Sequence, residues 1–324
     1  MTGSRTADRA LLADIGGTNA RFALAEGDEV GTIDHVRAAD FATARESIAA
    51  VLGRRADGGP VTAAVIAVAG TVTGNRCVMT NSSWVIDGAE LQREFGFRSI
   101  HVLNDFEALA WSLPALQPAD LFPLGGPAAV AGEPMLVLGP GTGFGVSCLI
   151  ERHGACLAVI TEAGHATLPA ETEREEQVID RMRRRLGHVS IERGALSGSG
   201  LQNLYQAVAE LDGVPAPKRD AAAITRAALE EGCDLSRATL DMFCAFLGSV
   251  AGNLAVTFCA RGGVYIAGGI VPRFPEFVAA SSFRTRFEAK GRYADYLRGI
   301  PTSLIVKPDA TFSGLKTFVD HNTA

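Results

Sequence analysis

The stretch LLADIGGTNARFALAEGD, residues 11–28, decides the architecture of this chain. An apolar run ends near the carboxylate of Asp14, a small polar turn occupies positions 16–19, and an alternating run covers 20–25. These patterns predict a buried β-strand, a hairpin turn and a second strand. A hairpin alone explains the glycines, because glycine tolerates unusual backbone angles. It does not explain Asp14, since an acid beside a turn rich in N–H groups suits a metal-bound polyphosphate.

The second half of the chain repeats this theme. Residues 135–138 predict a strand, a glycine turn with a threonine follows at 139–143, and another strand comes after it, with Gly139 in place of the acid. A third glycine pair follows the apolar VYIA run, where a strand ends and a helix can begin, although a simple turn would also explain it. We therefore predict that two hairpins hold the phosphates of one nucleotide from the two sides of a cleft. The predicted nucleotide-binding residues are Asp14, Gly16, Gly17, Thr18, Asn19, Gly141, Thr142, Gly143, Gly268 and Gly269.

Bulk properties exclude several classes of protein. A chain of 324 residues is longer than one core comfortably serves, so we expect two α/β lobes. The net charge of -6 argues against a nucleic-acid partner, which normally leaves a basic footprint. The first 17 residues have no apolar core of signal-peptide length, and the six cysteines have no zinc spacing. These features predict a cytoplasmic protein with reduced thiols.

One apolar segment, residues 242–260, is long enough to span a bilayer and contains Gly248 and Gly252 in a G-x-x-x-G pattern. It also contains Asn253 and runs directly into the strand-like GGVYIAGG. We interpret it as a buried helix that feeds a sheet, and we predict no membrane association.

Local signals place the remaining elements. We predict a helix over 44–55, a strand over 61–70, and a helix whose N-cap is Asp87, with Glu90 three residues later. A strand over 99–103 ends on polar residues and leads into a helix through position 111, after which prolines mark a lobe boundary. Acidic residues are expected at the start of one later helix and basic residues at its end, as the helix dipole favours; they are Glu171, Glu173, Glu175, Glu176, Arg181, Arg183, Arg184 and Arg185.

Several blocks together carry a family resemblance: LLADIGGTNARFAL, LNDFEALA, LGPGTGFGVSCLI, EAGH, HVSIERGALSGSGLQNLY and VYIAGGIVPRF. In this order, from residue 11 to beyond 299, they resemble the bacterial glucokinases of the actin and hexokinase superfamily. The resemblance implies a two-lobed, actin-like ATPase (ribonuclease H-like) α/β fold with a central cleft, with lobes at 1–115 plus about 306–324 and at 116–305. It also implies phosphorylation of glucose at its 6-hydroxyl by ATP with magnesium, in a homodimer.

The resemblance also implies roles for single residues. The sugar-binding positions are Asn81, Asn104, Asp105, Glu162, His165 and Glu192. Such groups suit a hexose, because carboxylates and imidazoles bond strongly to hydroxyls. Asp105 would be the general base, and Asp14 would act through magnesium or its waters. On the residues alone, capping a helix is the favoured role of Asp105, Glu162 and His165 could be a surface pair, and Glu192 could be an exposed helix residue.

The sequence departs from the family pattern at two places, and further functions stay open. Ala163 stands where a second glycine usually follows the acid, and the tail over 307–323 lacks the fuller glycine-leucine-glycine run expected near the adenine pocket. A ROK-type kinase or repressor would normally add a cysteine-rich zinc motif after EAGH, and none is present. A broader hexose kinase, a non-catalytic glucose-binding regulator and a sugar-independent ATPase are also compatible with parts of the pattern.

Overall fold

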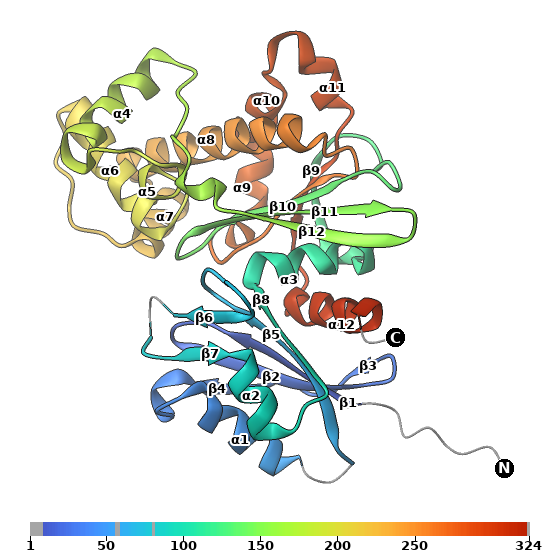
Figure 1. Cartoon of the computed structure of the whole chain (residues 1–324). Helices are drawn as coiled ribbons and strands as arrows, with labels where there is room; N and C mark the ends of the chain where they lie inside the picture. Colours follow the sequence, from blue (N-terminus) through green and yellow to red (C-terminus); the bar gives the residue numbers. More distant parts are fainter. Residues whose placement is uncertain (1–8, 56–58, 80–81, 323–324) are drawn as a thin grey trace. The chain divides into compact units, whose positions relative to one another are not determined.

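The computed structural model describes residues 9–55, 59–79 and 82–322, and these form two compact units. Unit 1 comprises Met1–Leu116 and Pro308–Ala324, and unit 2 comprises Gln117–Lys307. Each unit is an α/β structure with its own sheet and its own hydrophobic core (Figure 1). The units are therefore described separately.

Unit 1 is built on a mixed sheet in the order β3-β2-β1-β5-β8, with β4 also paired to β2. Strands β1, β5 and β8 are parallel, whereas β1 and β2 form the predicted hairpin. The apolar run of β5 is almost wholly buried, as expected of a strand covered on both faces. The strands are β1 (Arg9–Ile15), β2 (Asn19–Glu26), β3 (Glu29–Val30), β4 (Asp34–Arg37), β5 (Val61–Val68) and β8 (Ser99–Asn104), and a small separate hairpin pairs β6 (Arg76–Val78) with β7 (Val85–Asp87).

Helices cover both faces of this sheet. Figure 1 shows α1 and α2 on one face and α3 and α12 on the other. The predicted N-cap of α2 is confirmed, because the Asp87 side chain accepts hydrogen bonds from the backbone N–H groups of Ala89 and Glu90. The helices are α1 (Ala44–Arg54), α2 (Gly88–Phe95), α3 (Asp105–Ser112) and α12 (Ala310–Asn322), with short 3-10 turns at Ala38–Asp40 and Leu113–Ala115.

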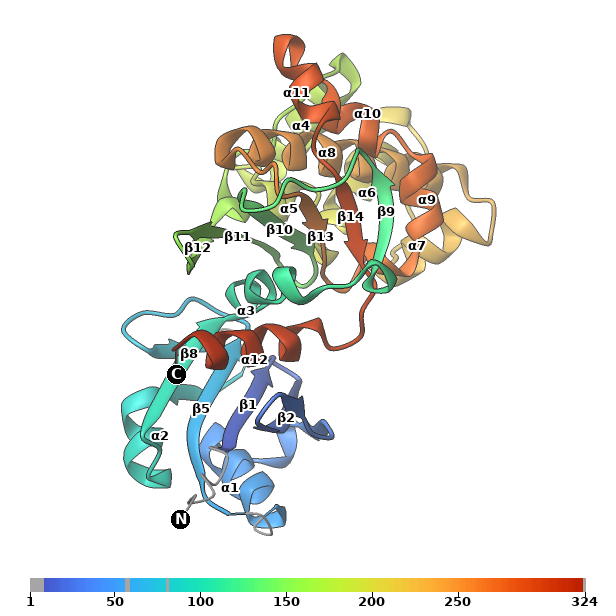
Figure 2. The same ribbon diagram turned by 90° about the vertical axis from the view of Figure 1, so that its right-hand side faces the viewer.

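Unit 2 has a second mixed sheet, in the order β12-β11-β10-β13-β14-β9. Figure 2 shows these strands side by side, with helices packed against the sheet. Its central strands β10, β13 and β14 are parallel, and its outer pairs are antiparallel. The strands are β9 (Leu121–Gly125), β10 (Met135–Pro140), β11 (Phe144–Arg152), β12 (Ala155–Thr161), β13 (Val264–Ile266) and β14 (Thr302–Ile305).

The helical part of unit 2 follows β12 in the chain. The helices are α4 (Glu173–Leu186), α5 (Ile191–Gly194), α6 (Gly198–Asp212), α7 (Ala221–Leu229), α8 (Asp234–Phe258), α9 (Pro275–Ala280), α10 (Phe283–Glu288) and α11 (Ala294–Arg298), with 3-10 turns at Pro118–Asp120, Ala163–His165, Val271–Arg273 and Gly291–Tyr293. The prediction that Glu171 lies on the same helix as the arginine cluster is wrong. Helix α4 begins later because the Thr172 side chain accepts from the Glu175 N–H while Glu175 reaches back, forming a capping box.

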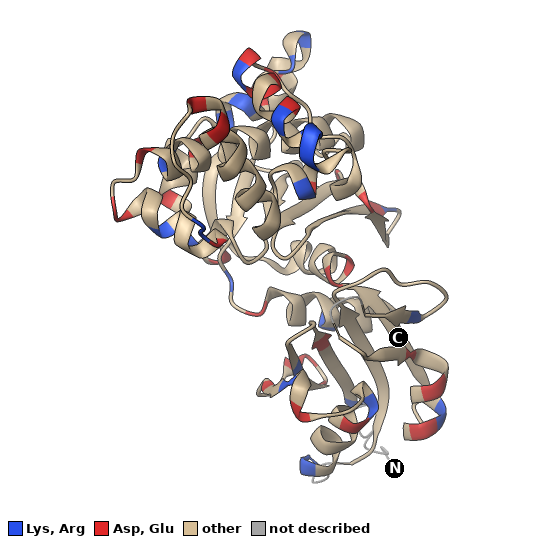
Figure 3. Cartoon of the chain, turned by 90° about the vertical axis from the view of Figure 1, so that its left-hand side faces the viewer, with Lys and Arg blue, Asp and Glu red and all other residues tan. Residues whose placement is uncertain are grey.

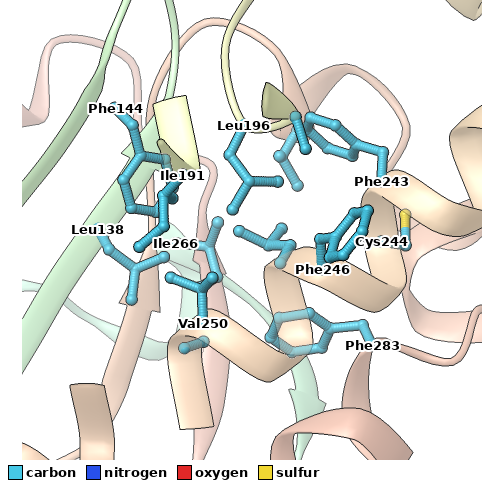
Figure 4. Packing of buried hydrophobic residues seen from close by; sticks show 14 of the residues in the cluster. Leu138, Phe144, Ile191, Leu196, Phe243, Cys244, Phe246, Val250, Ile266 and Phe283 are labelled. Carbon is cyan, nitrogen blue, oxygen red and sulfur yellow. The ribbon is translucent and has the colours of Figure 1, made fainter. Parts of the chain in front are cut away.

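The apolar segment flagged in the sequence is α8, and it is a core helix of unit 2. Within the described ranges it is the one helix long and apolar enough to cross a membrane, and 78% of its apolar window is buried inside the structure. Its aromatic and aliphatic side chains, such as Phe243, Phe246 and Val250, belong to the same buried cluster as Leu138 and Ile266 of the sheet (Figure 4). The expected buried helix is therefore confirmed.

The G-x-x-x-G pattern serves helix packing inside unit 2. A Cβ atom at Gly248 would lie 2.2 Å from the Phe283 carbonyl oxygen, and one at Gly252 would lie 2.4 Å from that of Phe287. Only hydrogen fits at these positions, so the pattern allows α10 to approach the backbone of α8 directly.

Figure 3 shows acidic and basic residues interspersed over the face it draws.

Candidate active site

The glycine turn of unit 1 presents a small polar surface at the end of β1. In the hairpin register, Asp14 faces Arg21 and Ile15 faces Ala20, so positions 16–19 form the turn. The Gly16 N–H donates to the Asn19 carbonyl oxygen at 2.9 Å and closes it. Thr18 and Asn19 are exposed. The turn thus has the form expected of a phosphate-binding loop, with the Asp14 carboxylate beside it.

Asp14 is held by a residue that the sequence analysis did not single out. Arg21 Nη2 donates to Asp14 Oδ2, and Arg21 Nη1 donates to Asp309 Oδ1. The hairpin register could have revealed Arg21, because residues 14 and 21 are opposite each other once the turn is placed. No sequence signal pointed to Asp309, which is 288 positions further along the chain.

Asp105 lies at the junction between β8 and α3, but it does not cap the helix. The N-cap is Asn104, whose Oδ1 accepts from the N–H groups of Phe106 at 2.9 Å and Glu107 at 3.4 Å. Glu107 reaches back to the Asn104 N–H at 3.3 Å and completes a capping box. The hypothesis that Asp105 is present to cap α3 is therefore wrong, since its neighbour does that.

The environment of Asp105 gives its carboxyl group an unusual proton affinity. Burial, followed by the negative charge of Asp14, raises the pKa of Asp105 to about 6. The N–H of Phe106, which donates to Asp105 Oδ1 at 3.0 Å, opposes this rise. A carboxyl group with this pKa can take up and release a proton near neutral pH, as a general base must.

The two predicted asparagines are less informative. Asn104 uses Nδ2 to donate to the Gly70 carbonyl oxygen at 3.1 Å and Oδ1 to cap α3. The second hydrogen on Nδ2 is the donor with which Asn104 can bind a sugar hydroxyl. Asn81 lies outside the described residues.

Unit 2 brings the predicted sugar-binding acids and histidine into one region. Glu162 directly follows β12, and its Oε2 is 3.8 Å from Nε2 of His165, the exposed last residue of the 3-10 turn. The Ile191 N–H donates to the Ala166 carbonyl oxygen at 2.8 Å and joins this turn to α5, which carries Glu192. The three predicted residues thus come from two segments that a backbone hydrogen bond joins.

Glu192 is fixed by the second glycine turn rather than freely exposed. Its Oε2 accepts from the Phe144 N–H at 3.0 Å. A Cβ atom at Gly143 would lie 2.8 Å from the same oxygen, so a larger residue there would make the Glu192 carboxylate shift. Gly143 therefore lies against Glu192, and the interpretation of Glu192 as an ordinary exposed helix residue is wrong.

The glycine turn in unit 2 is shorter than predicted. Strand β10 continues to Pro140, which pairs with Phe144, so the turn is 141–143 and not 139–143. Gly139 lies within the strand, and glycine is needed at this position because a Cβ atom there would lie 2.3 Å from the Ala267 carbonyl oxygen. Its glycine reflects the close approach of β10 and β13.

Gly268 and Gly269 have different roles. Gly268 has a φ of +90°, and a Cβ atom on it would lie 2.4 Å from the Pro140 carbonyl oxygen, so it is required for backbone packing. Gly269 has nothing within 4 Å of its Cβ position and is open. A 3-10 turn at Val271–Arg273 follows this pair, in place of the expected start of a helix.

Next to this turn, unit 2 contains a cavity of about 490 Å³. It is lined by Gly141, Thr142, Gly198, Ala221, Ala222, Thr225, Arg226, Leu229, Glu230, Gly269, Ile270, Arg273 and Phe274. The volume and the mixture of apolar walls and a few polar groups suit a small organic ligand such as a nucleoside. The sequence analysis identified the glycines of this cavity but not the residues that α7 contributes to its lining, because no local motif distinguishes them.

Comparisons with known proteins agree with these features. A family model described as Glucokinase matches residues 11–322. A glucokinase of Paramagnetospirillum magneticum is 47% identical over 312 residues, which cover 95% of this chain and 97% of the relative. The chain belongs to the glucokinase family.

Solved structures place the fold. The crystal structure of a glucokinase from an Antarctic psychrotroph is 33% identical, covers 97% of this chain and 99% of its own, and has a TM-score of 0.90. A ROK hexokinase from Thermus thermophilus, 18% identical over 96% of this chain and 97% of its own, has a TM-score of 0.68 and shows the fold alone. The predicted actin-like ATPase fold, common to glucokinases and ROK sugar kinases, is confirmed.

The two departures from the glucokinase family pattern now have structural explanations. Ala163 is partly buried and its side chain packs against the hydrophobic core of unit 2. The tail forms α12 in unit 1, where a Cβ atom at Gly314 would lie 1.8 Å from the Ala108 carbonyl oxygen of α3. No described residue of the tail lines the cavity in unit 2.

Proposed function

We propose that this chain transfers the γ-phosphoryl group of ATP to the 6-hydroxyl of glucose. The observation that carries the proposal is the pairing of Asp105, whose pKa is raised to about 6, with the phosphate-type hairpin of Asp14 in the same unit. Membership of the glucokinase family supports the choice of glucose and ATP.

The proposed roles divide between the units. In unit 1, Asp105 is the general base, and Gly16, Gly17, Thr18 and Asn19 hold phosphate oxygens through N–H groups and small polar side chains. Asn81 and Asn104 of the same unit are further sugar contacts. In unit 2, Glu162, His165 and Glu192 bind sugar hydroxyls. The nucleoside occupies the cavity lined by Gly141, Thr142 and Gly269, while Gly143 lies against Glu192 and Gly268 allows a close backbone contact with Pro140.

The reaction follows from these roles. Asp105 accepts the proton of the 6-hydroxyl as the hydroxyl oxygen bonds to the γ-phosphorus. The bond from this phosphorus to the bridging oxygen breaks, and ADP leaves with the bonding electrons. Asp105 then releases the proton to solvent. Because phosphoryl transfer depends mainly on positioning and charge neutralisation, the hairpin and the base are the groups that matter most.

Magnesium fits the residues of unit 1. The described residues contain no group of three or more His, Cys, Asp or Glu side chains that would form a cage. Kinases usually bind Mg²⁺ through one or two carboxylates together with the substrate phosphates, and Asp14 can serve directly or through a water. When bound, the ion neutralises phosphate charge. We further propose that the protein is a homodimer, as the family resemblance implies. We also propose that it works in the cytoplasm, because the thiols of Cys77, Cys148, Cys233, Cys244 and Cys259 are free.

A coupled assay tests the function directly. Purified protein is expected to form glucose 6-phosphate from glucose and ATP, to stop when EDTA removes divalent ions, and to recover with Mg²⁺ but not with Zn²⁺. Mannose, fructose and glucosamine as acceptors, and GTP and polyphosphate as donors, are measured in parallel. Faster turnover of another hexose would support a broader kinase, glucose binding without turnover would support a regulator, and ATP hydrolysis indifferent to sugar would support an ATPase.

The assignment of Glu162 to the sugar makes a separate prediction. Glu162→Gln keeps the shape but removes the charge, so the KM for glucose should rise by about tenfold or more while the KM for ATP changes less than about twofold. Glu151→Gln on β11, another exposed glutamate of the same unit, is the matched control and should leave both constants unchanged. An unchanged glucose KM in Glu162→Gln would remove this residue from the site.

A further inference from the structure

Arg21 connects two carboxylates that are far apart in sequence. Its two terminal nitrogens bond to different acids, Nη2 to Asp14 and Nη1 to Asp309. Its side chain is 27% exposed, that of Asp14 is 16% exposed and that of Asp309 is 33% exposed. The guanidinium is therefore partly shielded from solvent and shared between the phosphate hairpin and the C-terminal segment.

Arg21 also has a third contact, which fixes its orientation. Its guanidinium carbon lies 5.6 Å from the ring centre of Phe312, a side chain that is only 2% exposed on α12. A planar guanidinium that bonds two acids and stacks on a ring has little freedom to rotate. The position of Asp14 is consequently linked to the position of the first turn of α12.

Asp309 lies where the chain re-enters unit 1. It is the second residue of this segment, after Pro308, and it adopts a left-handed conformation with a φ of +55°. Its carbonyl oxygen accepts from the Phe312 N–H at 2.9 Å. Asp309 is thus tied to α12 through its backbone and to Arg21 through its side chain.

The residues just before Pro308 are anchored in unit 2. The N–H groups of Val306 and Lys307 donate to the Asp120 carbonyl oxygen at 2.9 and 3.2 Å, and Lys307 Nζ donates to Asp120 Oδ2 at 3.2 Å. Two residues later, the chain bonds to Arg21. Lys307 is thus bonded within unit 2 and Asp309 within unit 1.

We propose that Asp309 is a positioning residue for phosphoryl transfer, acting through Arg21 to hold the Asp14 carboxylate in place beside the phosphate-binding turn. This inference rests on the proposed function. Asp309 itself touches no reacting atom in this scheme. Its loss would leave Arg21 with one acid, free to turn towards solvent and take Asp14 with it. Displacements of about 1 Å at a reacting site can cost as much as a hundredfold in rate.

The test is a double-mutant cycle on Asp309 and Arg21. Asp309→Ala is expected to lower kcat by about tenfold or more, to leave the KM for glucose within about twofold, and to weaken MgATP binding measured by calorimetry without glucose. Asp309→Asn keeps an acceptor for Arg21 and should recover part of the loss. Arg21→Lys cannot bridge both acids, and the double variant Arg21→Lys/Asp309→Ala should be no slower than Arg21→Lys alone.

Asp34→Ala is the matched control. Asp34 in unit 1 bonds to Arg55 at 2.9 Å with a side-chain exposure of 29%, close to that of Asp309, but has no bond to Asp14. It should leave kcat unchanged, and it should lower the melting temperature less than Asp309→Ala does, because alanine is strained in the left-handed conformation of position 309. Additive losses in the cycle, a wild-type kcat in Asp309→Ala, or an equal kcat loss in Asp34→Ala would each overturn the inference. Failure of the wild-type protein to phosphorylate glucose would overturn the proposed function instead. The role of Asp309 would then be tested by comparing MgATP binding by Asp309→Ala with that by the wild type.

Discussion

Replacing Asp105 by asparagine is expected to lower kcat by roughly a hundredfold or more while glucose still binds. The amide keeps the size of the side chain and can still accept from the Phe106 N–H, but it cannot take the proton of the 6-hydroxyl. Helix α3 should be unaffected, because its cap is Asn104. Turnover is measured by the coupled assay and sugar binding by calorimetry on the same preparation.

Asp87→Asn is the matched control for this change. Asp87 also lies between a strand and a helix of unit 1, and asparagine caps a helix as well as aspartate does. The control should retain full turnover. Near wild-type turnover in Asp105→Asn would mean that another group is the base, and loss of both binding and turnover would mean that Asp105 mainly holds the sugar.

The pH profile gives a second view of the same residue. A general base must be deprotonated, and because the pKa of Asp105 is raised to about 6, the fraction of active carboxylate falls as the pH drops through this value. The kcat/KM for glucose should therefore decline below about pH 6, towards tenfold for each further unit. The residual activity of Asp105→Asn should lack this decline.

The second large effect is expected on stability, at a buried ion pair in unit 2. Arg286 donates from Nη1 and Nη2 to the two carboxylate oxygens of Glu175, at 2.6 and 2.9 Å, and from Nε to Ser249 at 3.1 Å. The Glu175 side chain is 4% exposed and that of Arg286 is 13% exposed. Glu175 also accepts from the N–H groups of Glu171 and Thr172, so the pair joins α4 to α8 and α10.

Arg286→Met should lower the free energy of unfolding by about 3–5 kcal/mol, because it leaves a buried carboxylate without its cation. Chemical denaturation followed by circular dichroism measures the loss. The matched control is Arg174→Met, which breaks an equally bidentate pair with Asp212, at 2.8 and 2.7 Å, on a surface where the arginine is 46% exposed. The control should cost less than about 1 kcal/mol.

A second variant separates charge from packing. In Arg286→Met/Glu175→Leu no charge remains buried without a partner, so part of the lost stability should return. If Arg286→Met costs no more than Arg174→Met, burial of this pair contributes nothing beyond a surface ion pair. Equal stability of the single and double variants would instead assign the loss to packing.

Local patterns in the sequence were sufficient for the elements that depend on near neighbours. The hairpin of β1 and β2, the cap at Asp87 and the burial of α8 all follow from residues within one or two turns of each other. The capping box at Asn104 was also visible in the sequence, since Glu107 follows three residues later. The sequence analysis instead considered the neighbouring Asp105 as the cap. Short strands such as β6 and β7 were missed, because three residues carry too little periodicity to read.

The sequence by itself determined which chemical groups are present and in what order: a carboxylate before a glycine turn, a second glycine turn, and acids with a histidine between them. The tertiary structure decided what each group does, because that depends on neighbours brought from far along the chain. Burial and Asp14 set the pKa of Asp105, Phe144 fixes Glu192, and Asp309 reaches Arg21 across 288 positions. Glycines at 139 and 268 resemble ligand-binding glycines in sequence, yet glycine is needed there because a Cβ atom would collide with a backbone carbonyl group that only folding brings close.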